Sequence, residues 1–363
     1  MSKIHVIIPV YNAKKFLREA VDSVLNQPYK GIDIVLVNDG STDGSAELCD
    51  EIAASGERVS VIHQENGGVS RARNAGIEFV LARSADEDYI AFLDADDLWI
   101  ENAITADIVQ MLQKKDAADL FAFGGFKSTQ NGERFGVPFR YEMGLHDGGE
   151  HMVWKIANTF CSNLYSLKLF RRFQLRFPSG MKYQEDTIFQ MQCVFLAEKL
   201  QCLDRLLHIY RDCENSAMHK RAAIPAITYY LPVVDAWVEA EDFLNRWESV
   251  TNKHFHTGRV LAGIALMEMA EQHYRQLRSR RELETVLKGH PHYALFERMN
   301  PRDVTAKRME SHDLLMKRPR LFQLKHHAIG IVENTARRIM RLRPLRIWWM
   351  KRKYPLTQMP TND

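Results

Sequence analysis

Short apolar runs alternate with helically spaced apolar stripes through the first hundred positions. Four runs have the length of buried strands, at 4–10, 33–37, 59–63 and 89–93. Helical patterns lie between them, over 16–25, 45–54 and 70–82. Because strand and helix alternate through short connections, the pattern predicts parallel strands joined by right-handed crossovers, and therefore an α/β fold.

The remaining chain predicts fewer strands and more helix. Strands are predicted at 120–123 and 206–211, and a helix over 187–198. Residues 127–150 are rich in glycine and charge and are expected to form a loop. Residues 223–287 follow a helical pattern without any catalytic signature, which predicts a C-terminal helical appendage.

These patterns divide the chain into three parts. We expect an α/β domain at 1–220, a helical domain at 221–315 and a tail at 316–363. The segment from Gly289 to Pro301 interrupts the helical pattern of the second part.

Composition is ordinary for a globular protein, but charge is unevenly distributed. The 363 residues are 45% hydrophobic and 26% charged, with a net charge of +3. Residues 320–363 carry ten Lys and Arg against two acids, which is +8, so the rest of the chain carries −5. The five cysteines have no C-x-x-C spacing and are odd in number, which favours reduced thiols in a cytoplasmic protein over a zinc site or a disulfide framework.

Two further observations concern membranes. The N-terminal apolar run is too short for a signal peptide, and no window reaches the roughly 18 apolar residues of a spanning helix. The tail combines helically spaced apolar residues between Leu321 and Leu342 with many cations, among which Trp348 and Trp349 lie. Such a segment is typical of a helix that lies on anionic lipid, which predicts a protein peripheral to the inner membrane. The alternatives are packing on the helical domain or binding nucleic acid, and no other motif supports nucleic acid as a partner.

Three carboxylates follow the predicted strand at 89–93. Asp94 and Asp96 are two positions apart, so on an extended segment they point to the same side. Oxygen ligands so placed suit a hard divalent ion, Mg²⁺ or Mn²⁺, that keeps waters and bridges phosphates. The alternative is that Asp97 caps a helix beginning near Leu98, with the other two acids as loop residues.

Parallel strands end at one edge of a sheet, where α/β proteins bind ligands. The expected topology therefore collects Tyr11, Asp39, Asn66 and Asp94 in one crevice. This convergence favours a ligand site over an unrelated set of loop residues.

Four motifs resemble a known family. Their order and spacing are similar to those of the inverting family-2 glycosyltransferases with the GT-A fold, and the resemblance covers about residues 3–216. The motifs are Pro9-Val10-Tyr11-Asn12, residues 37–43 (VNDGSTD), residues 66–76 (NGGVSRARNAG) and residues 93–97 (LDADD). The resemblance implies a Rossmann-like, mostly parallel sheet flanked by helices, with nucleotide-sugar binding in 1–98 and the acceptor side in 99–220. It also implies a nucleotide-sugar donor, usually a UDP-sugar, and a divalent metal.

The resemblance assigns roles to individual donor-side residues. Pro9 and Tyr11 would line the base pocket, and Asp39 would accept from the uracil imide N–H. Arg73 would donate to the base or to a nearby donor oxygen. Asp94 would hold the ribose side and lie beside the metal, and Asp96 would bind the metal that bridges the diphosphate. The alternatives are a loop-holding turn for Asp39 and a helix-surface ion pair for Arg73.

The acceptor half is similar to the family's from Asn163 to Asp186. The loop expected at 127–150 is predicted to lie near the acceptor. Inversion at an anomeric carbon needs one base on the acceptor side. Asp186 is the candidate, with Glu185 as the alternate; the competing role is an acid that caps the helix. His219 is placed where some relatives have an extra metal ligand, although a surface histidine is the alternative.

We therefore expect a metal-dependent inverting glycosyltransferase that acts on a surface polysaccharide or glycolipid acceptor. A sugar nucleotidyltransferase would need a glycine-rich, basic loop after the first strand, which the PVYN motif does not provide. The other alternative, a non-catalytic nucleotide-sugar binding module at a membrane, is disfavoured by the presence of both Asp96 and the Glu185-Asp186 pair.

Overall fold

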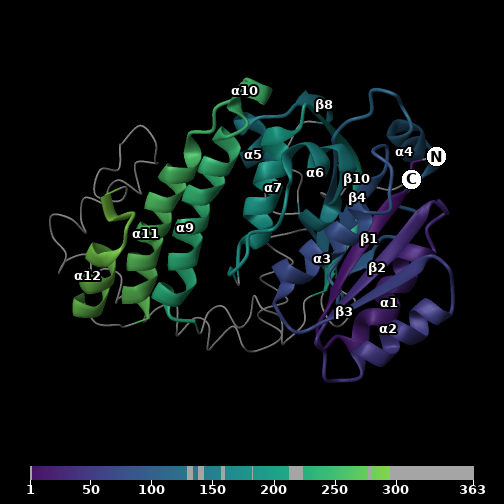
Figure 1. Cartoon of the computed structure of the whole chain (residues 1–363), viewed down its shortest axis with the longest axis horizontal. Coiled ribbons are helices and arrows are strands. Elements are labelled where there is room, and N and C mark those ends of the chain that lie inside the picture. Colours follow the sequence, from purple (N-terminus) through teal and green to yellow (C-terminus); the bar gives the residue numbers. More distant parts are fainter. Residues whose placement is uncertain are drawn as a thin grey trace. The chain divides into compact units, whose positions relative to one another are not determined.

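The computed structural model describes residues 2–128, 134–137, 143–156, 160–181, 183–211, 224–276 and 280–294. The chain divides into two compact units, whose described parts are residues 2–211 and 224–294 (Figure 1). The expected limits at 220 and 315, and the division of the first part at residue 98, stay predictions. The tail at 316–363 lies outside the described residues.

The first unit is built on one mixed sheet. Its strands run in the order β3-β2-β1-β4-β9-β6-β10-β5, with β7 paired to β6 and β8 paired to β10. The strands that run parallel to one another are β1 (Ile4–Val10), β2 (Ile32–Asp39), β3 (Val59–Gln64), β4 (Tyr89–Phe92), β6 (Leu120–Ser128) and β10 (Lys199–Arg211). The antiparallel strands are β5 (Leu98–Trp99), β7 (Arg134–Val137), β8 (Gly144–Asp147) and β9 (Asn163–Ser166). The predicted α/β fold with a mostly parallel sheet is confirmed.

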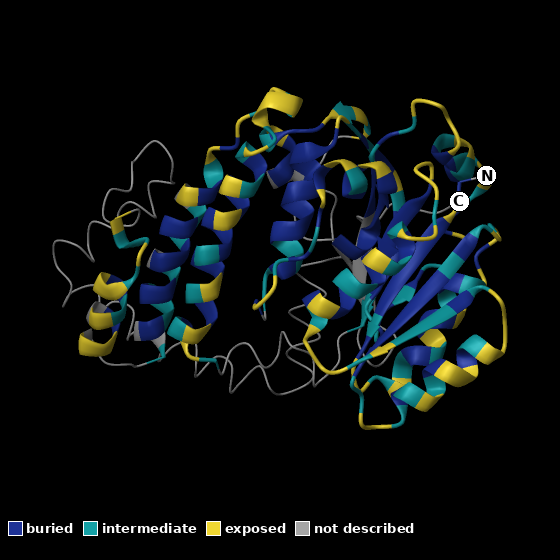
Figure 2. Cartoon of the chain, viewed as in Figure 1, coloured by how far each residue is buried: buried dark blue, intermediate teal, exposed yellow. Residues whose placement is uncertain are grey.

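Helices flank the sheet, and several of them bury a single apolar face. The helices of the first unit are α1 (Lys14–Leu25), α2 (Ser45–Ala54), α3 (Val69–Leu81), α4 (Ala106–Leu112), α5 (Glu150–Ile156), α6 (Leu167–Phe173) and α7 (Glu185–Leu196), with the 3₁₀ turn η1 (Phe160–Ser162). In α1 the buried residues are Leu17, Ala20, Val21 and Val24, the spacing of a single helical face. Figure 2 shows buried and exposed sides along α2 and α3 as well, whereas α7 is buried on nearly all sides.

Alternate residues of β1 face different helices. Val6 and Ile8 join the core that contains the buried face of α1. Ile7 points to the other face of the sheet, where α3 lies close because residue 76 is glycine: a Cβ there would lie 2.5 Å from Ile7 Cγ2. The pairing of β1 with β4 ends at Ile7, and Pro9 lies beyond it. The N–H that proline lacks is therefore not needed for the hydrogen bonds between β1 and β4.

Long-range pairing excludes one alternative and corrects two expectations. No helix begins at Leu98; residues 98–99 form β5, which pairs with β10, so Asp97 caps no helix there. The expected loop at 127–150 contains β7, β8 and the start of α5, although 129–133 and 138–142 lie outside the described residues. The strand predicted at 206–211 begins earlier, at Lys199.

The second unit is helical in its described residues, as the pattern of 223–287 predicted. Its helices are α9 (Ala226–Asn245), α10 (Glu248–Thr251), α11 (Thr257–Arg275) and α12 (Arg280–Gly289). Its long helices α9 and α11 pack together through buried residues such as Trp237 and Leu266. Within the described part of the chain, no helix is both long and apolar enough to cross a membrane. The described cysteines, Cys49, Cys161, Cys193 and Cys202, are buried free thiols.

Candidate active site

The residues predicted to share a crevice lie at one edge of the sheet. Tyr11 follows β1, Asp39 ends β2, Asn66 follows β3 and Asp94 follows β4. These four strands are parallel and adjacent, so all four residues lie at the same, carboxyl-terminal edge, as the sequence predicted.

Asp39 is a buried acceptor that organises the loop after β3. Its Oδ1 accepts from Gln64 Nε2 at 2.6 Å and from the Gly67 N–H at 2.9 Å, and its Oδ2 accepts from the Gly68 N–H at 2.9 Å. Gly68 has a φ of +84°, which glycine adopts without strain. Asp39 therefore has a loop-holding role, and its additional bond to a uracil N–H stays a prediction.

Tyr11 is exposed at this edge of the sheet. Its side chain is 54% exposed although aromatic, while Pro9 in β1 is half-buried. The neighbouring Asn12 ties the loop after β1 to the loop after β2: its N–H donates to Ser41 Oγ at 3.1 Å, and its Oδ1 accepts from the Thr42 N–H at 2.8 Å. An exposed ring on an anchored loop is suited to stacking on a planar ligand.

Arg73 connects Asp94, at this edge of the sheet, to α7. From the buried face of α3, its Nη2 donates to Asp94 Oδ1 at 2.8 Å and its Nη1 donates to Glu185 Oε1 at 2.9 Å. The side chain is only 4% exposed. Both terminal nitrogens thus face carboxylates. A direct hydrogen bond from Arg73 to the donor, which the resemblance implies, stays a prediction.

Aromatic rings enclose the Arg73 guanidinium. Its Cζ lies 4.5 Å from the ring centre of Phe160 and 5.1 Å from that of Phe177, which stacks on Phe189 at 3.9 Å. Burial opposes the charged guanidinium, but Asp94 and Glu185 outweigh it and raise the pKa of Arg73. The guanidinium is therefore a fixed cation at the centre of the site, and not the helix-surface ion pair considered as an alternative.

The Asp94–Asp97 loop carries more negative charge than its neighbours neutralise. Burial, reinforced by Asp97 and Asp94, raises the pKa of Asp96 to about 7. Asp94 is 35% exposed at its side chain and has one oxygen on Arg73. A partly buried carboxylate with like-charged neighbours is a favourable position for a cation.

The residues fit a divalent ion that shares its ligands with a substrate. Asp94 and Asp96 offer hard carboxylate oxygens, the donors that Mg²⁺ and Mn²⁺ prefer. Among the described residues, no three His, Cys, Asp or Glu side chains gather closely enough to hold an ion alone. An ion there would complete its shell with water and phosphate oxygens, as Mg²⁺ commonly does. His219, the predicted extra ligand, lies outside the described residues.

Asp97 belongs to a buried cluster that sequence reasoning missed. Its Oδ2 lies 2.8 Å from His208 Nε2, and its Oδ1 accepts from the Arg211 N–H at 2.8 Å. The available signal was His208 itself, a lone polar residue in the apolar run Leu206-Leu207-His208-Ile209. Its partner lies more than a hundred positions away, which periodicity cannot reveal.

The two acids of α7 have different surroundings. Glu185 is buried against Arg73, and burial, with Asp186 adding to it and Arg73 opposing, raises its pKa. Asp186 is half-buried, and its Oδ1 accepts from the adjacent Thr187 N–H at 2.7 Å. Asp186 lies in the first turn of α7 but is not its N-cap, which is Gln184, and its Oδ2 has no hydrogen bond or ion pair to any described residue.

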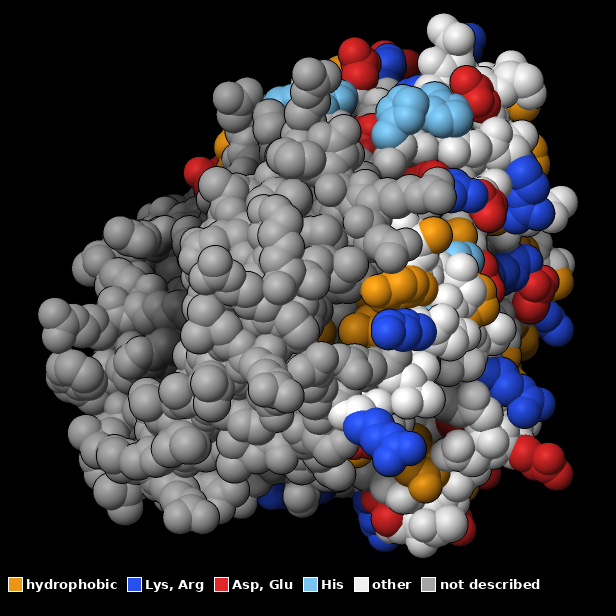
Figure 3. Space-filling view, turned by 90° about the vertical axis from the view of Figure 1, so that its left-hand side faces the viewer, with side chains coloured by type: hydrophobic (Ala, Val, Ile, Leu, Met, Phe, Trp, Pro, Cys, Tyr) orange, Lys and Arg blue, Asp and Glu red, His pale blue; other side chains and the backbone are white. Residues whose placement is uncertain are grey.

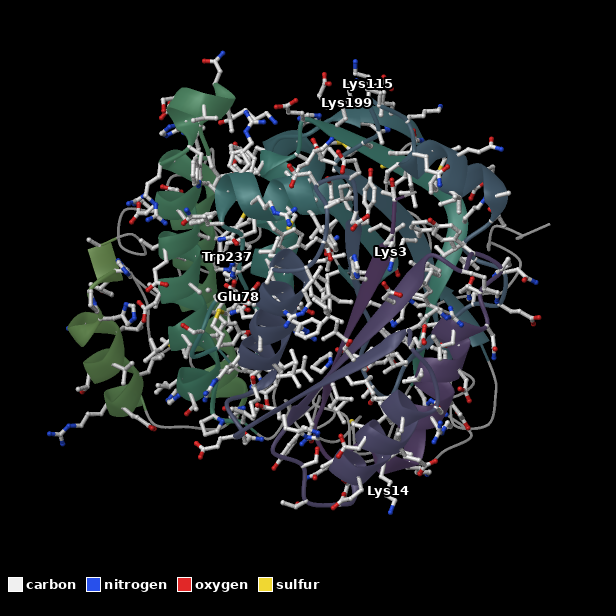
Figure 4. All side chains as sticks on the ribbon, turned by 45° about the vertical axis from the view of Figure 1, so that its right-hand side comes forward. Lys3, Lys14, Glu78, Lys115, Lys199 and Trp237 are labelled. Carbon is white, nitrogen blue, oxygen red and sulfur yellow. The ribbon has the colours of Figure 1, made fainter. Side chains whose placement is uncertain are left out.

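A separate cleft of about 460 Å³ lies at the opposite edge of the sheet. It is lined by residues before β4 and β6, by α6 and by the start of β10, including Asp86, Asp119 and Lys199. Lys115 and Lys199, labelled in Figure 4, mark its position. None of the predicted site residues lines it.

Comparison with known proteins places these features in context. Residues 5–164 match the family model described as glycosyl transferase family 2. The uncharacterized glycosyltransferase EpsJ of Bacillus subtilis is 32% identical over 225 residues, which are 59% of this chain and 62% of EpsJ. The chain thus spans less than two thirds of that relative. Glycosyltransferase GlyG of Streptococcus pneumoniae serotype 4 is 32% identical over 229 residues, 59% of this chain and 72% of GlyG.

A solved structure supports the fold. S. aureus TarS in complex with UDP-GlcNAc superposes with a TM-score of 0.58 at 19% sequence identity, over 93% of this chain and 92% of that one. At that identity the likeness concerns the fold alone. The match over residues 5–164 and the extent of the GlyG alignment establish that the chain belongs to glycosyl transferase family 2.

Proposed function

We propose that the protein is a metal-dependent inverting glycosyltransferase. It moves a sugar from a nucleotide-sugar donor, of the UDP-sugar class, to a hydroxyl of a surface polysaccharide or glycolipid acceptor. Family membership and the glycosyltransferase names of EpsJ and GlyG support the reaction class. One observation carries the proposal furthest: Arg73 links Asp94 of the donor crevice to Glu185, which is adjacent to the candidate base Asp186.

The donor crevice has the groups that a uridine nucleotide requires. The exposed ring of Tyr11, beside Pro9, offers a stacking surface for a base. Asp39 accepts three hydrogen bonds from its own loops, and its two carboxylate oxygens offer about four acceptor positions, so one acceptor position remains for an imide N–H. The complex of TarS with UDP-GlcNAc makes that donor the first to test.

Asp96, with Asp94 beside it, would hold the divalent ion. A bound Mg²⁺ or Mn²⁺ neutralises the negative charge that develops on the departing diphosphate. The raised pKa of Asp96 supports this assignment because a carboxylate that lacks a cation partner gains most from one. Asp94 also holds the ribose side in this proposal, and its contact with Arg73 fixes the orientation of its carboxylate.

Asp186 is the proposed general base. Its Oδ2 has no described partner, whereas Glu185 Oε1 already accepts from Arg73. Asp186 would take the proton from the acceptor hydroxyl while the hydroxyl oxygen forms a bond to the anomeric carbon. The bond from that carbon to the diphosphate oxygen breaks on the opposite face, and its electron pair leaves with the nucleoside diphosphate. Attack from the opposite face inverts the configuration.

A donor screen tests the proposal. Purified protein with Mn²⁺ is incubated with uridine, guanosine and deoxythymidine diphosphate sugars, and nucleoside diphosphate release is measured. We expect release from a UDP-sugar in the wild type and its loss in Asp186→Asn. NMR of the first product formed would show an anomeric configuration opposite to that of the donor. Tight UDP binding without turnover of any donor, tested with a range of glycan acceptors, would favour a non-catalytic binding module instead.

The tail supports a membrane-bound setting for the acceptor. Its cations and its Trp348-Trp349 pair favour contact with anionic lipid at the inner face of a membrane, although these residues lie outside the described part of the chain. On the face shown in Figure 3, the described Lys, Arg, Asp and Glu side chains are mixed and form no patch of one sign. We assign the peripheral attachment to the tail on the basis of its sequence.

A further inference from the structure

The loop that contains Asp96 is bound to β10 through both main-chain and side-chain hydrogen bonds. β5 pairs with β10, with Trp99 opposite His208 and Leu98 opposite Ile209. One residue further, the Ile100 N–H donates to Leu207 O at 2.8 Å. The segment from Asp96 to Ile100 therefore takes its path from β10 and not from local helix or turn propensity.

Asp97 makes the central contact and is unable to serve as a metal ligand in this arrangement. It is 1% exposed, and its two oxygens point to His208 Nε2 and to the Arg211 N–H, each at 2.8 Å. Its own N–H donates to Asp94 O at 2.9 Å, which closes the turn between the two proposed ligands. Asp97 thus fixes the main chain on the far side of Asp96.

Arg211 fixes Asp96 itself. Its Nε donates to the Asp96 carbonyl at 2.9 Å. Its Nη2 donates to Glu19 Oε2 at 2.6 Å, and its guanidinium lies 4.8 Å from the ring centre of Phe16. Glu19 and Phe16 of α1 therefore fix the position of the Arg211 side chain, which in turn binds the Asp96 carbonyl.

We infer that His208, Asp97 and Arg211 are positioning residues that set the direction of the Asp96 carboxylate for a divalent ion bound with the donor diphosphate. None of the three touches the reacting atoms. The inference rests on the proposed function, because it assigns a support to the metal ligand of that reaction. Groups that orient metal ligands typically change metal affinity about 10- to 100-fold when removed.

The test is a titration of Mn²⁺ into the full-length protein, with free Mn²⁺ measured by electron paramagnetic resonance in the presence of UDP. We expect His208→Ala to weaken Mn²⁺ binding about 10- to 100-fold. His208→Gln places an amide nitrogen near the position of Nε2, so it should bind Mn²⁺ within about threefold of the wild type. Metal-free UDP binding, measured by calorimetry in chelator, should be the same in all of these proteins.

A matched control removes a comparable contact elsewhere. His254 Nδ1 lies 2.8 Å from Glu248 Oε2 in the second unit, so His254→Ala deletes a histidine–carboxylate pair of the same length and should leave Mn²⁺ binding unchanged. Arg211→Met keeps the packing of the side-chain stem and loses the bond to Asp96, so it gives the same test if His208→Ala fails to fold.

Wild-type Mn²⁺ affinity in both His208→Ala and Arg211→Met would overturn the positioning role, as would a His208→Gln protein as weak as His208→Ala. A different result would contradict the proposed function. A wild-type protein that binds Mn²⁺ with UDP but transfers sugar from no donor would overturn the transferase assignment, and the Mn²⁺ titration would still decide the positioning role.

Discussion

Arg73 Nη1 donates a 2.9 Å hydrogen bond to Glu185 Oε1, and this contact joins two helices that are far apart in the sequence, α3 and α7. The same guanidinium holds Asp94. Removing the cation would leave Glu185 as a buried acid without its partner, beside Asp186. Arg73 therefore links the proposed base to the donor-side residues through its two carboxylate partners.

We predict that Arg73→Met destabilises the protein by roughly 3 to 5 kcal/mol, the usual cost of breaking a buried ion pair. Urea unfolding would measure the loss. The control is Arg176→Ala, which removes an exposed pair at 2.5 Å to Glu78 of α3, labelled in Figure 4. That change should lower the free energy of unfolding by less than about 1 kcal/mol. Equal losses in the two variants would mean that the Arg73 bridge contributes no more than a surface contact.

We predict different effects on the rate of sugar transfer for substitutions of Asp186 and Glu185. Asp186→Asn should keep UDP affinity and lower the rate of sugar transfer by roughly a hundredfold or more, because the acceptor hydroxyl loses its base. Glu185→Gln keeps an oxygen that can accept from Arg73, so it should lose less activity. Single-turnover kinetics at saturating donor measures both. If Glu185→Gln is inactive while Asp186→Asn turns over normally, the two roles are exchanged.

The first half of the fold could be predicted from the sequence because its signals are local. The strands β1 to β4 and the helices between them follow from apolar periodicity, and the ends of parallel strands bring Tyr11, Asp39 and Asp94 to one edge. The rest depends on pairing at a distance. β5 is only two residues long, and it forms through its pairing with His208 and Ile209 of β10. The local sequence does not encode this pairing, so a helix beginning near Leu98 stayed an alternative.

The same limit applies to the charges of the site. The sequence identified Arg73, Glu185 and Asp94 separately, yet gave no sign that the first would bridge the other two. The sequence is compatible with both a ligand role and a loop-holding role for Asp39. Its hydrogen bonds from Gly67 and Gly68 form because the folded sheet places the loop after β3 beside the end of β2. Side-chain partners across strands are set by three-dimensional register, which periodicity does not encode.

Asp39 can be tested for both roles at once. Asp39→Ala should weaken UDP binding by about 1 to 3 kcal/mol, the cost of leaving a buried donor unpaired. Gln64→Ala removes one loop hydrogen bond to the same carboxylate, at 2.6 Å, and leaves the carboxylate in place. Calorimetry with UDP should therefore show a loss for Asp39→Ala well beyond that for Gln64→Ala. Equal losses would assign Asp39 to the loop alone.

Asp96 predicts an unusual dependence of stability on pH in the absence of metal. Its pKa in the folded protein is raised to about 7 from an ordinary value of 3.8, by burial and by Asp97 and Asp94. The folded state therefore binds a proton more tightly than the unfolded chain, so stability falls as the pH rises from about 4 to 7, and the full penalty is present above that range.

Asp96→Asn removes this penalty. In chelator at pH 8 the variant should be more stable than the wild type, by about 1.4 kcal/mol for each unit of the shift, and the two should converge near pH 4. Urea unfolding across this range measures the difference. A constant difference at every pH would show that Asp96 titrates normally. In activity assays, Asp96→Ala and excess chelator should each abolish turnover, and full activity in chelator would remove the metal from the mechanism.

The basic tail gives the last prediction, which rests on the sequence alone. Between Arg337 and Lys353 eight cations accompany Trp348 and Trp349. Each cation near an anionic surface contributes about 1 kcal/mol, so eight could hold the protein there at moderate salt. Deleting residues 320–363 should leave a folded protein that no longer sediments with anionic liposomes, while its UDP affinity is unchanged. The full-length protein should also be released by high salt, because the attraction is screened over about 10 Å at 0.1 M ionic strength. If the full-length protein ignores anionic liposomes at low salt, or if the truncated protein unfolds, the tail is a structural element and the membrane assignment is wrong.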